Sequence, residues 1–167
     1  MNSKTLHVLL ADDDIDDCQF FKKALEGLPL STRLTTVHDG ELLIKYLTNH
    51  PEDVPGVIFL DLSMPRKTGF ECLFDIKQNE KFKDIPVFVF STSFSRDLVY
   101  EQNLIGTLSD IGAQEYIRKP GDFDQLKMII HNSLTKVIEK RKLNGQFSKD
   151  GRAIPSDDTI SQQAIKI

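Results

Sequence analysis

The chain has 167 residues, of which 40% are hydrophobic and 28% are charged, and its formal net charge at pH 7 is −4. These values are typical of one globular domain, and the acidic balance argues against a broad basic surface for nucleic acid. The longest apolar run is too short to span a membrane and the start lacks a signal-peptide pattern, so we expect a cytoplasmic protein with no membrane partner.

Five short runs rich in β-branched and aromatic residues recur along the chain. They are HVLLA (7–11), RLTTV (33–37), GVIFL (56–60), PVFVFS (86–91) and EYIRK (115–119). The third and fourth runs are apolar without alternation, which is typical of strands that are buried on both faces of a sheet. We therefore predict five strands of one parallel sheet.

The stretches between these runs carry apolar residues at a spacing of three to four, which predicts amphipathic helices. We expect these helices at residues 15–27, around Leu42–Leu47, around Leu73–Ile76, from a cap at Ser95 through Leu108, and from about Phe123 to Arg141. Cys18 and Cys72 show no paired spacing, and we interpret both as reduced packing residues.

The repeated order of strand and helix predicts an α/β domain with a flavodoxin-like (βα)5 doubly wound parallel sheet and strand order 2-1-3-4-5. The periodic pattern covers residues 1–142. Residues 143–167 are polar and contain Gly and Pro, and they are too few to bury a core of their own. We expect them to form a tail with no separate output domain.

Chemically active side chains follow the strand runs. Asp12 and Asp13 end the first run, and Asp61 ends the third. In the predicted order these two strands are adjacent, and ligands of open parallel sheets bind beyond the carboxyl ends of the strands. The three acids are therefore expected to lie together, with Ser91 from the fourth strand and Lys119 from the fifth beside them.

A cluster of carboxylates needs a cation or a proton, because two of them about 4 Å apart repel by roughly 4 kcal/mol at an effective dielectric constant near 20. An all-oxygen ligand set favours Mg²⁺, with Mn²⁺ as an alternative. A hydroxyl and the Lys119 ammonium would complement a phosphoryl group. Asp61 is the carboxylate best placed to attack phosphorus and form an acyl phosphate.

Four segments together resemble the receiver domain of two-component response regulators over about residues 5 to 140. They are LLADDD, IFLDLSMPRKTG, VFVFSTS and EYIRKP, in this order. The resemblance implies that Asp61 is the phosphoacceptor and that Asp12 and Asp13 bind the metal, Asp13 directly and Asp12 through water. It also implies that the backbone carbonyl of Ser63 binds the metal.

The resemblance assigns further roles near the last two strands. Ser91 would be the switch hydroxyl, with Thr92 and Ser93 as adjacent rivals, and Lys119 would contact the phosphoryl group. Tyr116 would be an aromatic switch, and the bond from Lys119 to Pro120 is a candidate cis peptide. The chain departs from the family pattern between Ser93 and Gly112, where it is longer by roughly five residues.

The function that this resemblance implies is uptake of a phosphoryl group from a phosphohistidine on a histidine kinase or a phosphotransfer protein. The domain would catalyse its own phosphorylation and dephosphorylation and signal through protein contacts, with a homodimer as one such contact. The PRKTG and STS stretches are similar to single-domain regulators, including those paired with phytochrome-type kinases.

Three alternatives stay open at this stage. In the first, no metal binds, and Asp12 and Asp13 serve only as caps of the first helix. For Asp14, Asp16 and Asp17 we adopt this interpretation, as caps and as part of a solvated helix face. A degenerate receiver would be a binding module that works without phosphorylation. A phosphatase with an aspartyl nucleophile is the third, but its usual DxDxT motif after the first strand is absent from DDDID.

Overall fold

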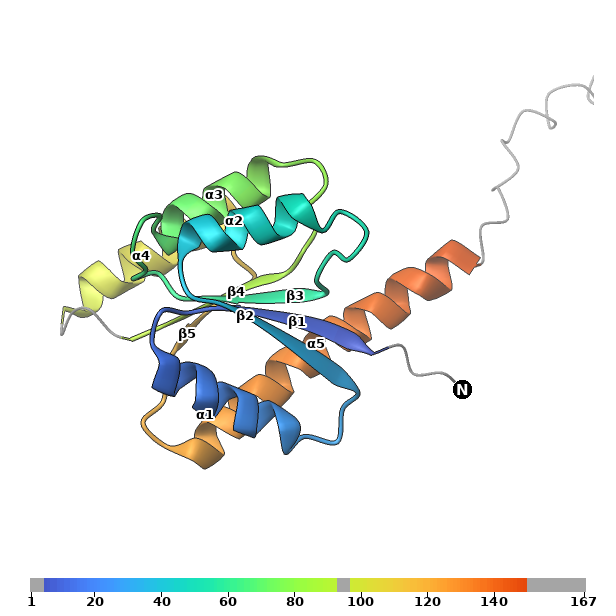
Figure 1. Cartoon of the computed structure of the whole chain (residues 1–167), viewed down its shortest axis with the longest axis horizontal. Coiled ribbons are helices and arrows are strands. Elements are labelled where there is room, and N and C mark those ends of the chain that lie inside the picture. Colours follow the sequence, from blue (N-terminus) through green and yellow to red (C-terminus); the bar gives the residue numbers. More distant parts are fainter. Residues whose placement is uncertain (1–4, 93–96, 150–167) are drawn as a thin grey trace, which may run out of the picture. The chain divides into compact units, whose positions relative to one another are not determined.

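The computed structural model describes residues 5–92 and 97–149, with side chains up to residue 145 (Figure 1). The strands are β1 (Leu6–Ala11), β2 (Thr32–Val37), β3 (Val57–Leu60), β4 (Val87–Ser91) and β5 (Glu115–Arg118). The helices are α1 (Ile15–Glu26), α2 (Gly40–Asn49), α3 (Gly69–Gln78), α4 (Leu98–Ile111) and α5 (Phe123–Lys149). All strand pairs are parallel and the order is β2-β1-β3-β4-β5, so the predicted fold class is confirmed.

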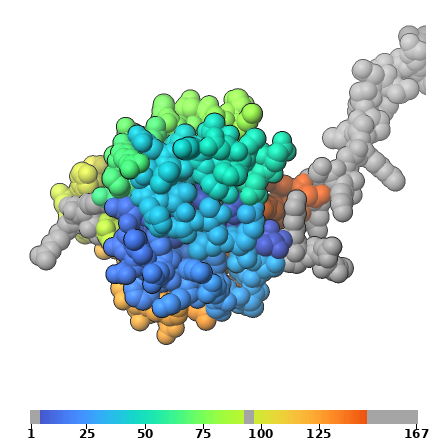
Figure 2. Space-filling view, in the orientation of Figure 1, coloured from blue at the N-terminus to red at the C-terminus, as the bar shows by residue number. Residues whose placement is uncertain are grey.

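The sheet and the chain up to Val137 form one compact unit in which helices cover both faces of the sheet. Figure 1 shows α1 and the first part of α5 on one face and α2, α3 and α4 on the other. In the space-filling view, α2 and α3 gather above and α1 and the first part of α5 below (Figure 2). Central strands covered in this way have no solvated face, which explains why β3 and β4 are apolar at every position except Ser91.

Each face of the sheet has its own core, because side chains alternate along a strand. Ile58 and Leu60 of β3 point toward α2 and α3 and join an aliphatic cluster with Leu43, Leu73 and others. Phe59 points the other way and packs against Phe21 of α1, with 4.9 Å between the ring centroids. Packing on both faces of the sheet holds β3 in place. It therefore also holds Asp61, which follows β3 at its carboxyl end.

The helix starts are capped by acidic or hydroxyl side chains. Asp14 accepts hydrogen bonds from the backbone N–H groups of Asp16 and Asp17, so the capping role predicted for Asp14 is confirmed. Asp97 caps α4 by accepting from Val99 and Tyr100. The sequence had favoured Ser95 as this cap, and Ser95 lies outside the described residues.

The end of α5 differs from the expectation. The helix was expected to stop near Arg141, with a tail from residue 143, but it continues to Lys149. Residues 143–145 are exposed and lie in the helix without burying an apolar face. A helix already formed adds residues at little cost, because only the first turn carries the nucleation penalty. None of the helices in the described ranges is long and apolar enough to cross a membrane.

The start of α3 packs directly on the turn that carries Asp61. A Cβ atom added to Gly69 would lie 2.1 Å from the backbone oxygen of Asp61 and 2.7 Å from the Cα atom of Leu62. The Gly69 amide also donates to the Leu62 carbonyl at 3.0 Å. Only glycine therefore lets the helix approach this turn so closely.

Gly69→Ala is expected to destabilise the fold by about 2 kcal/mol, because overpacking against backbone forces the helix and the turn apart. Urea unfolding measures this change. The control is Gly106→Ala in α4, where an added Cβ would have no heavy atom within 4 Å. That variant should gain about 0.5–1 kcal/mol from helix propensity. Equal effects of the two changes would contradict the close packing at Gly69.

Candidate functional site

The acids of the first and third strands meet because their strands are paired in register. Ala11 of β1 pairs with Leu60 of β3, and the Asp61 amide donates to the Ala11 carbonyl at 2.9 Å. Asp12 and Asp61 follow these residues directly, and both are buried. Asp13 is exposed beside them. Carboxylate oxygens of all three residues lie within 4.8 Å of one another, as the strand order requires.

Lys119 points its ammonium into this cluster. Its Nζ atom lies 2.6 Å from Oδ2 of Asp12, 2.9 Å from Oδ2 of Asp17 and 3.1 Å from Oδ2 of Asp61. The Lys119 amide donates to the Ser91 carbonyl at 2.9 Å, which extends the pairing of β4 and β5 by one residue and directs the side chain to the site. The lysine predicted from the fifth strand therefore lies beside the predicted acids.

The second oxygen of Asp61 is held by β4 and by the turn after β3. Ser91 Oγ donates to Asp61 Oδ1 at 3.0 Å, and the Ser63 backbone N–H donates to the same oxygen at 3.1 Å. Ser91 is fully buried, whereas Thr92 is exposed, and Ser93 lies outside the described residues. Both oxygens of Asp61 are thus fixed in direction, which is the pre-organisation that a nucleophile needs.

The charges of the site are unbalanced, because one ammonium faces four carboxylates, those of Asp12, Asp13, Asp17 and Asp61. Burial raises the pKa of Asp12 to about 6, even though the Lys119 hydrogen bond and charge lower it. Burial also lowers the pKa of Lys119, but the hydrogen bonds that it donates to Asp12 and Asp17 and the charges of Asp12 and Asp61 raise that pKa well above its usual range. Lys119 therefore stays charged, and the site retains excess negative charge that a cation would neutralise.

Asp17 was missed as a site residue. The sequence favoured a solvated helix face for it, but its carboxylate is only partly exposed and contacts Lys119. A sequence signal existed, because Asp17 lies in the first turn of the helix that follows the acids at the end of the first strand. That signal needs the position of Lys119 to become meaningful.

Tyr116 is half-buried and packs against the aliphatic core below α4. Burial and the charge of Glu101 raise the pKa of its phenol, which stays neutral. Glu101 is held by Arg118 of β5, whose Nη2 donates to both carboxylate oxygens at 2.6 Å. These contacts connect α4 with β5, in the region where the chain is longer than expected, but they show no switch at Tyr116.

The expectation of a cis peptide at Pro120 is wrong, since the bond between Lys119 and Pro120 is trans. A trans bond is the lower-energy form even before proline. Lys119 reaches Asp12 and Asp61 with this bond trans, so the position of its ammonium does not require the cis form.

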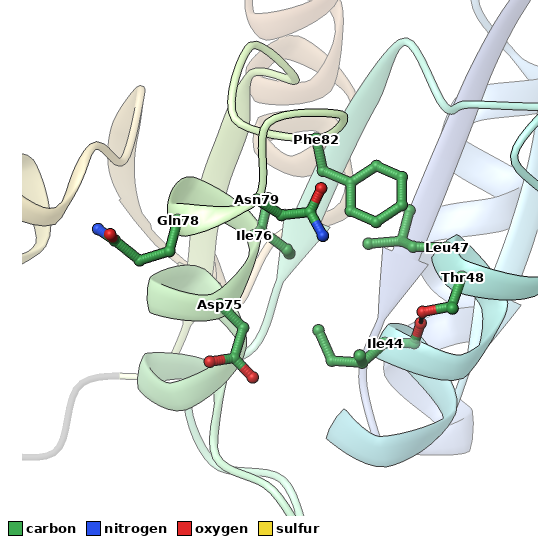
Figure 3. A pocket seen from close by; sticks show the side chains of 8 residues that line it. All are labelled: Ile44, Leu47, Thr48, Asp75, Ile76, Gln78, Asn79 and Phe82. Carbon is green, nitrogen blue, oxygen red and sulfur yellow. Dashed lines mark hydrogen bonds between the residues drawn. The ribbon is translucent and has the colours of Figure 1, made fainter.

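Two of the pockets that the described residues form lie in different parts of the fold. One, of about 300 Å³, opens beside Lys119 and is lined by Asp17, Phe20, Phe90, Lys119, Pro120, Gly121, Asp122, Phe123 and Leu126. The other, of about 350 Å³, lies between α2 and α3 (Figure 3) and is lined by Ile44, Leu47, Thr48, Asp75, Ile76, Gln78, Asn79 and Phe82. The acid of this second pocket, Asp75, is already paired with Lys67 at 2.5 Å. Reactive groups therefore gather at the first pocket and at the neighbouring strand ends.

The donor set fits a hard divalent cation. Asp12, Asp13 and Asp61 offer only oxygen ligands, the type that Mg²⁺ and Mn²⁺ prefer. The nearby Cys18 is buried, and burial raises the pKa of its thiol to about 12, so it supplies no thiolate. Its Sγ instead donates to the Asp12 carbonyl at 3.4 Å.

Comparison with known proteins agrees with this geometry. The family model described as response regulator receiver domain matches residues 8–131. The chain is 31% identical over 126 residues to the probable methanogenesis regulatory protein FilR2 of Methanothrix harundinacea, covering 74% of this chain and 77% of that protein.

Solved structures show the same fold. The phosphorylated cyanobacterial phytochrome response regulator RcpA is 30% identical with a TM-score of 0.67, and the match covers 76% of this chain and 89% of RcpA. The Mn²⁺-bound form of response regulator Rcp1 is 26% identical with a TM-score of 0.65, and the match covers 76% of this chain and 90% of Rcp1.

Proposed function

The chain belongs to the response regulator receiver domain family of two-component signalling, and on this premise we propose that Asp61 accepts a phosphoryl group in a step that needs a divalent cation. The observation that carries the proposal is the buried Asp61 carboxylate. Ser91 and Lys119 hold its two oxygens, beside a cluster of further acids. Buried acids in excess of their cations are costly, and a cation together with phosphoryl chemistry would explain them.

The chain's own residues would act as follows. An Asp61 oxygen attacks phosphorus, so that a bond to phosphorus forms as the bond from phosphorus to the donor's imidazole nitrogen breaks, and the imidazole retains the electron pair. Lys119 donates to the phosphoryl oxygens and offsets their charge, and Ser91 turns its hydroxyl from Asp61 to one of them. A divalent cation held by Asp12, Asp13, Asp61 and the Ser63 carbonyl would supply further neutralisation of phosphoryl charge.

The proposed donor is a phosphohistidine on a histidine kinase or a phosphotransfer protein. The likeness to RcpA, which was solved phosphorylated, and to Rcp1, which was solved with Mn²⁺, supports both parts of the proposal. The phosphorylated domain would act in the cytoplasm through protein contacts, a homodimer included, and would hydrolyse its own acyl phosphate. Movement of Ser91 toward the phosphoryl group, with a change at Tyr116 behind it, would alter the surface of α4 and β5.

The test is incubation with acetyl phosphate and Mg²⁺, followed by intact-mass spectrometry. We expect the mass of one phosphoryl group on the wild type, none after metal chelation, and none on Asp61→Asn. Asp75→Asn is the matched control, because Asp75 is an acid of α3 that pairs with Lys67 and is not among the acids that pair with Lys119. It should be phosphorylated like the wild type.

The alternatives predict other outcomes. A wild type that gains no phosphoryl group, but still binds a partner, would be a binding module and would overturn the proposal. Sustained turnover of small phosphomonoesters would instead favour an aspartyl-nucleophile phosphatase.

A further inference from the structure

The third partner of Lys119 is an acid outside the predicted metal cluster. Oxygens of Asp12 and Asp61 serve both the lysine and that cluster, whereas Asp17, among the described residues, pairs with the lysine and does not belong to the cluster. We propose that Asp17 is a positioning residue, which holds the Lys119 ammonium at the site while one of its N–H groups moves from Asp61 to a phosphoryl oxygen. This inference rests on the proposed function.

The hydrogen-bonding capacity of the lysine supports this role. An ammonium has three N–H donors, and Lys119 has three acceptors, one oxygen each from Asp12, Asp17 and Asp61. When the Asp61 carboxylate becomes an acyl phosphate, its oxygens lose their negative charge and become weaker acceptors. One donor is then released toward the phosphoryl group, and the other two still need acceptors.

Asp17 is the acceptor that the reaction leaves unchanged. A cation shared by Asp12 and Asp61 would withdraw electron density from the oxygens that now accept from Lys119, whereas Asp17 would keep its full charge. The side chain of Lys119 is 9% exposed, and that of Asp17 is 38% exposed. The acid therefore lies at the mouth of the site, where it also lines the adjacent pocket, and it can retain the ammonium without blocking Asp61.

Local structure holds Asp17 in this position. Its backbone N–H donates to the Asp14 cap at 3.0 Å, so its place in the first turn of α1 is fixed. Asp16 lies one residue earlier in the same turn and is exposed, and it is not among the acids that pair with Lys119. The two neighbours thus differ in their contact with the lysine, and Asp16→Ala is a matched control for net charge and for the helix start.

The experiment compares phosphorylation rate constants with acetyl phosphate in two backgrounds, wild type and Lys119→Met. Asp17→Ala should slow the reaction by about fivefold in the wild type, the ratio expected when one half-exposed ion pair is lost. Asp17→Asn keeps an acceptor oxygen, so it should slow the reaction less than Asp17→Ala does. In the Lys119→Met background Asp17→Ala should change nothing further, and Asp16→Ala should have no effect in either background.

A second readout needs neither metal nor phosphoryl group. In ¹⁵N-lysine NMR of the metal-free protein, the Lys119 ammonium should give a signal protected by its hydrogen bonds, assigned by its loss in Lys119→Met. Asp17→Ala should weaken or shift this signal, and Asp16→Ala should leave it unchanged. Thermal unfolding checks that each variant is folded.

The outcomes separate the two proposals. If the wild type takes up no phosphoryl group, the proposed function fails and the positioning role fails with it. If the wild type reacts but Asp17→Ala slows both backgrounds equally, or leaves the Lys119 signal unchanged, the positioning role alone is overturned.

Discussion

Lys119→Met is expected to lower the free energy of unfolding of the metal-free protein by about 3 kcal/mol near pH 8. The ammonium is almost fully buried, and it is the cation that the structure shows against Asp12 and Asp61, which are also buried. Without it these carboxylates face each other uncompensated. Breaking a buried pair by removing one partner is costly for this reason, whereas loss of an exposed pair is not.

Chemical denaturation with a chelator present measures this change. Mg²⁺ should restore much of the lost stability, because it supplies the positive charge that the ammonium no longer provides. The control is Lys136→Met, since Lys136 of α5 pairs with Glu115 in an exposed position, and its loss should cost less than about 1 kcal/mol. Similar stabilities of the two variants would show that Lys119 does not compensate the acid cluster.

Asp12→Asn is expected to have the opposite effect on the metal-free protein. The pKa of Asp12 is raised from an ordinary 3.8 to about 6, mainly by burial. Asp12 therefore contributes stability that is fully present below pH 3.8 and is lost as the pH rises through about 6. Asn does not titrate. Between about pH 4 and pH 8, the free energy of unfolding of the variant should therefore increase relative to that of the wild type by on the order of 2–3 kcal/mol.

The same substitution should impair metal binding. Asp12 belongs to the cluster that fits a divalent cation, so Asp12→Asn should weaken Mg²⁺ binding strongly while it stabilises the apo protein. In the wild type, Mg²⁺ affinity should fall below about pH 6, since protonation of Asp12 competes with the metal. Unfolding curves at several pH values and Mg²⁺ titration by calorimetry measure the two effects.

Asp16→Asn is the control for this pair of measurements. It removes the same charge from an exposed position in the first turn of α1, and it should change neither the pH profile nor the metal affinity appreciably. A wild type whose stability stays flat from about pH 4 to pH 8 would contradict the raised pKa of Asp12. Together these expectations describe a site that is destabilised while empty and stabilised by its ligand.

The predicted elements follow from local physics, and most of them were found from the sequence. Hydrophobic runs of the length of a strand and apolar residues at helical spacing place β1 to β5 and α1 to α5 within a few residues. The main miss was the end of α5, which continues to Lys149, and whose residues 143–145 are exposed. The apolar periodicity of a sequence indicates the buried face of a helix, so it gives no signal where the helix is exposed.

The choice among neighbouring polar residues needed the structure. Ser91, Thr92 and Ser93 were rivals in the sequence, and the pairing of β4 with its neighbours buries Ser91 against Asp61 and leaves Thr92 exposed. Successive side chains of a strand point to opposite sides, so the choice depends on the register between strands. The residues of one strand alone do not determine that register, because it is a relation between two strands.

By itself, the sequence determined the order of the elements and which acids stand at strand ends. From that order the meeting of Asp12 and Asp61 follows, because parallel strands end at one edge of the sheet. The tertiary structure decided that Asp17 joins Asp12 and Asp61 around Lys119, which lies 107 residues after Asp12, 102 after Asp17 and 58 after Asp61 in the chain. A contact between a helix start and a strand end depends on how the two elements pack, and packing is set by the whole fold.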